Sequence, residues 1–150
     1  MNNFNTDAIA THNFRPHGRV DISIHEEGII KYLATGPFNK ELAEVLAEMD
    51  NHATQIFKLK FGQWCELITF QHSCMALEDS LVSLEHHLLD KKDRKIAQLA
   101  SAFVFTPDIE GHRFMAKKYE QCYRRAGITY RSFNNEKDAL KWARACRPKA

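Results

Sequence analysis

A nearly unbroken apolar run at residues 100–105 stands between two segments whose apolar residues recur at helical spacing. A strand that is apolar on both faces needs cover from both sides, which is typical of a central strand in a mainly parallel sheet. Residues 64–70 form a second such run, again followed by a helical pattern. Strands that alternate with helices predict an α/β domain built from right-handed crossovers.

The region before these repeats predicts a hairpin. Residues 19–25 alternate between apolar and polar side chains, and residues 29–35 follow after a short turn. Two such strands pair antiparallel. The predicted fold is therefore a mixed, mostly parallel five-stranded sheet with an N-terminal antiparallel hairpin and about four flanking helices. Residues 1–18 show no sustained period and predict a flexible lead-in, so residues 19–150 are expected to form a single domain.

Helix boundaries follow from residues that favour helix ends. Gly127 is expected to end the third helix in a left-handed conformation. Pro107 suits the first position of that helix, because a missing N–H is tolerated there. The predicted N-terminal caps are Asn39, Ser73, Thr106 and Asn135.

Residues 56–70 are predicted to be extended throughout, first as Phe57, Leu59 and Phe61 alternating with lysines and then as the interior strand. An apolar strand at the edge of a sheet tends to pair with a neighbour. Residues 54–62 are therefore expected to extend the sheet edge, to cover a pocket or to contact a second subunit, and a homodimer through residues 54–62 is one hypothesis.

Composition places the chain among ordinary globular proteins, with 44% apolar and 27% charged residues. The apolar runs are far shorter than the roughly 20 residues that a membrane helix needs, and the N-terminus lacks a basic start followed by an apolar stretch. We expect a cytoplasmic protein without a membrane span. The cysteines form no Cys-x-x-Cys pair and are expected to be buried thiols: Cys65, Cys74, Cys122 and Cys146.

Charge is distributed unevenly along the chain. Residues 112–150 hold 11 Lys and Arg against 3 Asp and Glu, whereas residues 1–111 hold 10 against 16. Such a basic segment is one feature of nucleic-acid binding, but helical spacing spreads these charges over two helices and no recognised motif accompanies them. The pattern favours a solvated surface over a nucleic-acid partner. The residues concerned are Lys117, Lys118, Arg124, Arg125, Arg131, Lys141, Arg144 and Arg147.

Ligands of open α/β sheets favour the loops beyond the carboxyl ends of the parallel strands, where helix N-termini present free N–H groups. Two such loops can be identified, one after residues 64–70 and one after residues 100–105. Their polar side chains are expected to converge at one mouth. The candidate ligand- or partner-binding residues are Gln71, His72, Ser73, Thr106, Asp108 and His112.

Catalysis at this mouth would need His72 or His112 as a base and Ser73 or Cys74 as a nucleophile. The sequence has no Gly-x-Ser-x-Gly elbow and no Gly-rich phosphate loop. The adjacent pair at positions 86 and 87 lacks the spacing of metal ligands and predicts solvated histidines. We expect no catalytic residues, no metal and no cofactor.

The C-terminal half resembles the STAS domain and its SpoIIAA-like relatives, the anti-sigma factor antagonist family. The similar stretches are AFVF at 102–105, the helix with Phe114 and Tyr119, ITYRSF at 128–133 and DALKW at 138–142. The resemblance implies a non-catalytic regulatory or protein-interaction module, with a protein partner or a small apolar or anionic ligand. It also implies a phosphorylation site near Ser80, although the string Glu78-Asp79-Ser80-Leu81 lacks the glycine of the family's motif.

A second function class remains open. A small-molecule or lipid carrier would need an enclosed apolar pocket instead of a flat partner surface. Bound ligand in the purified protein would distinguish the two classes.

Overall fold

The apolar runs form one mixed sheet of six strands in a computed structural model that describes residues 3–8 and 16–148. The strands lie side by side in chain order. The first three pair antiparallel and the last four pair parallel, so that β3 belongs to both sets. The α/β class and the N-terminal hairpin are confirmed, with one strand more than expected. The strands are β1 (Phe4–Asn5), β2 (Arg19–Glu26), β3 (Ile29–Thr35), β4 (Cys65–Gln71), β5 (Ala100–Val104) and β6 (Thr129–Phe133).

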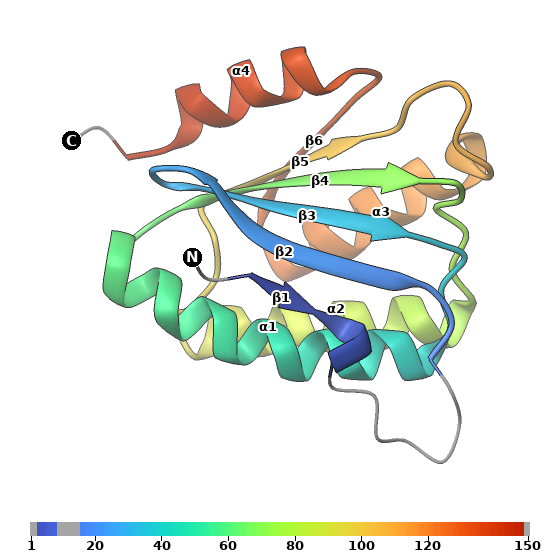
Figure 1. The fold of residues 1–150 in the computed structure, drawn as a ribbon, viewed down its shortest axis with the longest axis horizontal. Helices are drawn as coiled ribbons and strands as arrows, with labels where there is room; N and C mark the ends of the chain where they lie inside the picture. The colour runs from blue at the N-terminus through green and yellow to red at the C-terminus, as the bar shows by residue number, and fades with distance from the viewer. Residues whose placement is uncertain (1–2, 9–15, 149–150) are drawn as a thin grey trace.

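Three helices cover one face of the sheet and one covers the other (Figure 1). From β3 to β6 every crossover moves in the same direction, and right-handed crossovers of this kind place their helices on one face. The last helix follows β6 and packs on the opposite face against β4, β5 and β6. The helices are α1 (Lys40–Phe61), α2 (Glu78–Asp93), α3 (His112–Ala126) and α4 (Glu136–Cys146).

The predicted strand at residues 56–61 is wrong, because these residues are the last turns of α1. Phe57 lies on one face of α1 with Met49 and Ala53, which precede it at intervals of four residues, and all three are buried. Leu59 points to solvent with 90% of its surface exposed. The alternation of large apolar residues therefore arose from a helix, and the homodimer expected through an extended segment at 54–62 loses its structural basis.

The helix ends agree with the sequence at three positions. Asn39 and Asn135 cap α1 and α4 by accepting hydrogen bonds from backbone N–H groups, and Gly127 ends α3 at φ 74°. The caps predicted at Ser73 and Thr106 are wrong, because α2 starts after Leu77 and α3 after Gly111.

The shift of both helix starts has a physical cause in the backbone. Residues 73–77 stay extended and pair with residues 36–38, with Gly36 N–H donating to the Ser73 carbonyl at 3.0 Å and Phe38 N–H to the Met75 carbonyl at 2.8 Å. The parallel pairing of β3 with β4 thus continues past the sheet. These hydrogen bonds occupy the groups that an earlier helix start would have used.

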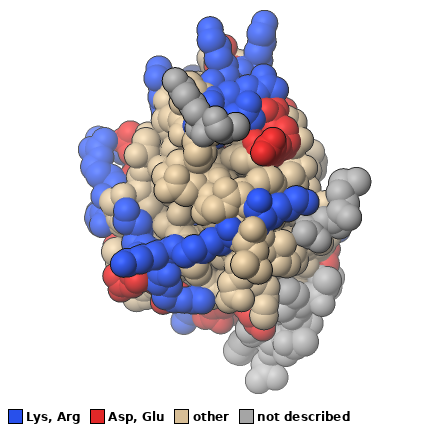
Figure 2. Space-filling model, turned by 90° about the vertical axis from the view of Figure 1, so that its left-hand side faces the viewer, with Lys and Arg blue, Asp and Glu red and all other residues tan. Residues whose placement is uncertain are grey.

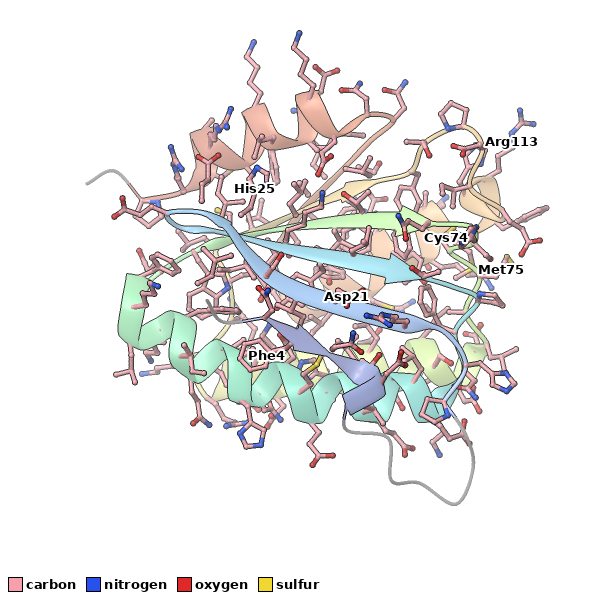
Figure 3. The ribbon with its side chains drawn as sticks, viewed as in Figure 1. Phe4, Asp21, His25, Cys74, Met75 and Arg113 are labelled. Carbon is pink, nitrogen blue, oxygen red and sulfur yellow. The ribbon has the colours of Figure 1, made fainter. Side chains whose placement is uncertain are left out.

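The N-terminal lead-in contributes the sixth strand. Phe4 pairs with Ile22 across β1 and β2, and its ring meets Phe57 of α1 edge-on at 6.4 Å (Figure 3). The sequence predicted residues 1–18 to be a flexible or loosely docked lead-in, and Phe4–Asn5 dock on the sheet as a short edge strand. Residues 9–15 lie outside the described part of the chain.

The two faces of the sheet carry different cores. Large side chains such as Phe70, Phe103 and Tyr119 fill the space under α1, α2 and α3. Small residues, including Ala139 and Ala143, let α4 approach the other face closely. Three of the four cysteines are buried and free and the fourth, Cys146, is half-buried, in agreement with thiols that serve as small apolar groups.

Two arginines tie α4 to the N-terminal hairpin. Arg144 and Arg147 donate to the carboxylate of Glu26 at 2.7 and 2.6 Å. Hydrogen bonds from Arg144 and then Arg147 lower the pKa of Glu26 from 4.5 to about 2. This clamp joins the end of the chain to the turn between β2 and β3.

Five of the ten described Lys and Arg side chains in residues 112–148 form ion pairs with acids, namely Lys118, Arg124, Arg125, Arg144 and Arg147. Figure 2 shows Lys and Arg in more than one group on this face, with uncharged surface between the groups and Asp or Glu beside them. On α3, Arg124 pairs with Glu120 and Arg125 with Glu85. Among the described residues, no helix combines the length and the apolar character needed to cross a membrane.

We predict that Glu26→Gln lowers the free energy of unfolding by about 1 kcal/mol at pH 7, because the clamp is partly exposed and screened by solvent. A carboxylate whose pKa is lower in the folded state stabilises above its ordinary pKa. The difference from wild type should therefore shrink as the pH falls from 4.5 towards 2. Urea unfolding at several pH values measures it. Glu27→Gln, next to it and exposed, is the control, and an equal loss in both variants would contradict the clamp.

Candidate functional site

The two loops predicted to converge do meet at the carboxyl end of the sheet. Gln71 ends β4, and its side-chain oxygen accepts a hydrogen bond from Thr35 at 3.2 Å. His72 follows at φ 63°, and its carbonyl accepts from the N–H of Glu110 at 3.0 Å. A non-glycine residue with positive φ stores strain. The backbone contact with Glu110 holds this bend in place.

Ser73 is buried and its hydroxyl is fully used. It donates to the Glu110 carboxylate at 2.9 Å and accepts from the N–H of Met75 at 3.1 Å. Cys74 lies next to it (Figure 3), with its thiol 3.4 Å from the Glu110 carbonyl. Burial raises the pKa of the Cys74 thiol to about 11. In the described residues, Ser73 bonds to the Glu110 carboxylate and Cys74 to the Glu110 carbonyl, with no histidine hydrogen-bonded to either, so Glu110 joins the two loops.

The second loop satisfies its polar groups internally. Thr106 donates to the Asp108 carboxylate, and this hydrogen bond lowers the pKa of Asp108. His112 is half-buried in the first turn of α3, with Nδ1 3.0 Å from the Ile109 carbonyl oxygen. A shallow depression beside His112 is bounded by Phe105, Ala116, Ser132, Phe133 and Asn134. Of the six predicted residues, only His112 borders this depression. Gln71 bonds to Thr35 of β3, whereas Ser73, Thr106 and Asp108 form contacts within the two loops.

The most unusual chemistry lies deeper, between α1, α2 and the sheet. Asp50 is buried, and its carboxylate accepts from the hydroxyl of Tyr32. Its second oxygen lies 2.7 Å from His87 Nε2 and 2.9 Å from Lys91 Nζ. Burial alone would raise the pKa of Asp50, but attraction by Lys91 and the hydrogen bond from His87 lower it below its ordinary value.

A second buried carboxyl adjoins this ion pair. Oε2 of Glu66, on β4, accepts hydrogen bonds from Trp64 Nε1 at 3.3 Å and from Lys91 Nζ at 3.4 Å. Tyr32 Oη lies 3.0 Å from the same oxygen. Burial raises the pKa of Glu66 despite the attraction of Lys91, and the charge on Asp50 adds to this rise. The pKa values of these two carboxyls, which share one lysine, are thus shifted in opposite directions.

We call this group the buried network: Tyr32, Asp50, Trp64, Glu66, His87 and Lys91. An unpaired charge in a protein interior costs several kcal/mol, so each member depends on the others. Perturbed carboxyl pKa values in a closed interior are a feature of functional sites as well as of structural ion pairs. What distinguishes the two cases is whether open space reaches the network.

A cavity of about 100 Å³ adjoins the buried network. Its walls are mostly apolar and come mainly from β3, β4 and β5 and from α1 and α2, which run in the same direction over the sheet (Figure 1). The half-exposed members of the lining, Leu46 of α1 and Leu84 of α2 among them, place its mouth between these helices. The apolar lining includes Ala34, Leu42, Ile68, Phe70, Leu81 and Phe103, and the polar end consists of Asp50, Glu66, His87 and Lys91.

Two tyrosines of α3 also line the cavity but differ in their hydroxyls. Tyr119 donates to the carbonyl of Cys74 at 2.8 Å. The hydroxyl of Tyr123 makes no hydrogen bond to any residue in the described ranges 3–8 and 16–148. Ser80, the candidate phosphorylation site, lines the same cavity, with 3% of its surface exposed and its hydroxyl 3.5 Å from the Phe38 carbonyl.

Sequence reasoning missed the buried network, although signals were present. His87 was expected to be solvated, but it is buried, and so is Lys91, which lies one helical turn later on the same face of α2. Glu66 interrupts an apolar run, and Asp50 stands one helical turn after Leu46. A charge at an apolar phase of the pattern is the signal that could have identified each residue.

Comparison of the chain with protein-family models, with curated proteins and with solved structures found no match.

We predict that Lys91→Met destabilises the protein by about 3 kcal/mol, because Asp50 and Glu66 would lose their shared cation in the interior. Guanidinium unfolding followed by circular dichroism measures the loss. Lys92→Met changes the adjacent exposed lysine and should cost less than about 0.5 kcal/mol. Equal costs would show that the buried network is not an interdependent unit.

A second pair of variants compares the two hydroxyls. Tyr119→Phe should cost about 1 kcal/mol, because the carbonyl of Cys74 loses its donor. Tyr123→Phe should leave the free energy of unfolding unchanged, since its hydroxyl has no protein partner in the described residues. Urea unfolding of both variants under the same conditions provides the measurement. A cost for Tyr123→Phe equal to that of Tyr119→Phe would contradict the assignment.

Proposed function

We propose that the protein is a non-catalytic module that binds a small, mainly apolar ligand in the cavity between α1, α2 and the sheet. The cavity itself carries the proposal, because it has apolar walls, a polar inner end and a mouth between two helices. Binding sites for small molecules commonly combine these features. Apolar cavities of about 150 Å³ hold a single benzene ring. A space of about 100 Å³ suits a compact group or the end of a longer molecule.

The non-catalytic part of the proposal rests on the local geometry. At the carboxyl end of the sheet, Ser73 and Cys74 have Glu110 and backbone groups as partners instead of a histidine. In the interior, Asp50 and Lys91 neutralise each other. This arrangement favours binding over nucleophilic attack.

A protein-interaction module of the STAS or SpoIIAA-like type is the second candidate. It is favoured by large apolar side chains exposed near the starts of α2 and α3, where Leu77 is 61% and Phe114 is 76% exposed. Met75 lies beside Gly111 in the same region. Exposed apolar groups of this size are typical of partner surfaces. Membership of that family stays a prediction.

We predict that Ala34→Leu fills the cavity without loss of stability, whereas Ala53→Leu costs about 2 kcal/mol through overpacking. Both alanines are buried, but only Ala34 borders the cavity. Thermal unfolding compares the two variants.

Ligand capacity is tested with benzene as the probe. Protein amide NMR shifts around the cavity should respond to benzene in the wild type and stay unchanged in Ala34→Leu. Native mass spectrometry of freshly purified protein would also report a retained ligand as extra mass. The proposed function would be overturned if benzene left the amide NMR shifts of the wild type unchanged and both leucine variants were equally destabilised.

A further inference from the structure

The Tyr123 hydroxyl is an unused hydrogen-bond donor at the cavity. The residue is only 4% exposed, and buried hydroxyls normally have a partner. Its oxygen is not among the fully enclosed and unpartnered side-chain atoms of the described residues, so it touches open space. Tyr123 lines the cavity, and Glu66 and Asp50 at its polar end act electrostatically on the Tyr123 phenol. Ring contacts with Phe103 at 5.0 Å and Tyr130 at 5.3 Å hold the phenol in position.

The Glu66 carboxyl supplies a second free atom at the same cavity. All its hydrogen bonds in the described part of the chain go through Oε2, where Trp64 and Lys91 direct N–H groups. Oε1 therefore remains available, and it is not fully enclosed either. Burial raises the pKa of Glu66 above its ordinary value. Oε1 is thus a second polar atom without a hydrogen-bond partner in the described residues.

Both free atoms belong to one polar end. Burial, and then the charges of Glu66 and Asp50, raise the pKa of the Tyr123 phenol well above the ordinary value. The phenol thus keeps its proton and acts as a donor. A ligand oxygen beside Tyr123 would receive a hydrogen bond from its hydroxyl.

The charges around the cavity favour a neutral ligand oxygen over an anionic one. Lys91 directs its amine to Asp50 at 2.9 Å and to Glu66 at 3.4 Å. His87 also faces Asp50. An anionic ligand group would therefore enter the interior without a free cation to pair with, which is costly. A neutral acceptor avoids that cost.

We infer that the cavity recognises a neutral carbonyl oxygen on an otherwise apolar ligand, with the Tyr123 hydroxyl as its donor. This inference rests on the proposed function and specifies its ligand class. It narrows the expected small apolar or anionic ligand to an uncharged carbonyl compound at this site.

Two probes of nearly equal shape test the inference. Cyclopentanone carries a carbonyl oxygen where methylenecyclopentane carries a CH₂ group. Dissociation constants for both are measured by protein NMR titration with the wild type, Tyr123→Phe and Tyr119→Phe. Tyr119→Phe is the matched control, because its hydroxyl is already bound to Cys74. Circular dichroism checks that both variants are folded.

The expected result is a change in the ratio of the two dissociation constants. Tyr123→Phe should weaken cyclopentanone binding about tenfold and leave methylenecyclopentane binding unchanged, which corresponds to one lost hydrogen bond. Tyr119→Phe should keep the wild-type ratio. Comparing ratios removes the difference in hydration between the probes.

The remaining outcomes separate the two claims. If the wild type binds neither probe, the proposed function fails and this inference fails with it. If both probes bind and Tyr123→Phe keeps the wild-type ratio, ligand binding stands but carbonyl recognition by Tyr123 is overturned. An equal change of the ratio in Tyr119→Phe would also overturn it.

Discussion

The ion pair of Asp50 with Lys91 links the elements that surround the interior. Asp50 comes from the middle of α1 and Lys91 from the end of α2, and each is almost fully buried. Burying either charge without the other would cost several kcal/mol. Their contacts with Tyr32 and Glu66 extend the link to β3 and β4. The spacing of α1 and α2 over the sheet is thus set by polar contacts at one end.

The cavity follows from this arrangement. Polar contacts with strict distances hold the helices at the inner end, whereas small residues such as Ala34, Ala43 and Ala76 line the remainder. Small side chains leave space that the fixed helices cannot close. At the carboxyl end, the extended segment at 73–77 and Phe38 form the wall. A rigid polar end beside a less densely filled apolar region is a reasonable basis for selective binding.

Local signals predicted much of the fold, and non-local contacts account for the errors. The run at 100–105 identified β5, and Asn39, Gly127 and Asn135 marked helix ends through hydrogen bonds or conformations within a few residues. The late start of α2 depends on the pairing of residues 73–77 with residues 36–38, which are distant in sequence. Before α3, residue 110 is held by hydrogen bonds with residues 72 and 74, which are equally distant.

The candidate site was less predictable than the fold. The loops with Ser73 and His112 were placed at the correct edge of the sheet, because the position of strand ends follows from topology. The partners of Asp50 are separated from it by 18 to 41 positions, so no local pattern reveals them. Only tertiary structure shows that residues from α1, α2, β3 and β4 share one set of protons and charges.

The agreement between strand order and chain order has a consequence for folding. Each strand pairs with the one made just before it, so the sheet can lengthen at a single edge as the chain emerges during synthesis. Contacts between elements close in sequence favour rapid folding. The clamp of Glu26 by Arg144 and Arg147, 118 and 121 positions away, spans nearly the whole chain. We expect this clamp to form last, after the rest of the domain has folded.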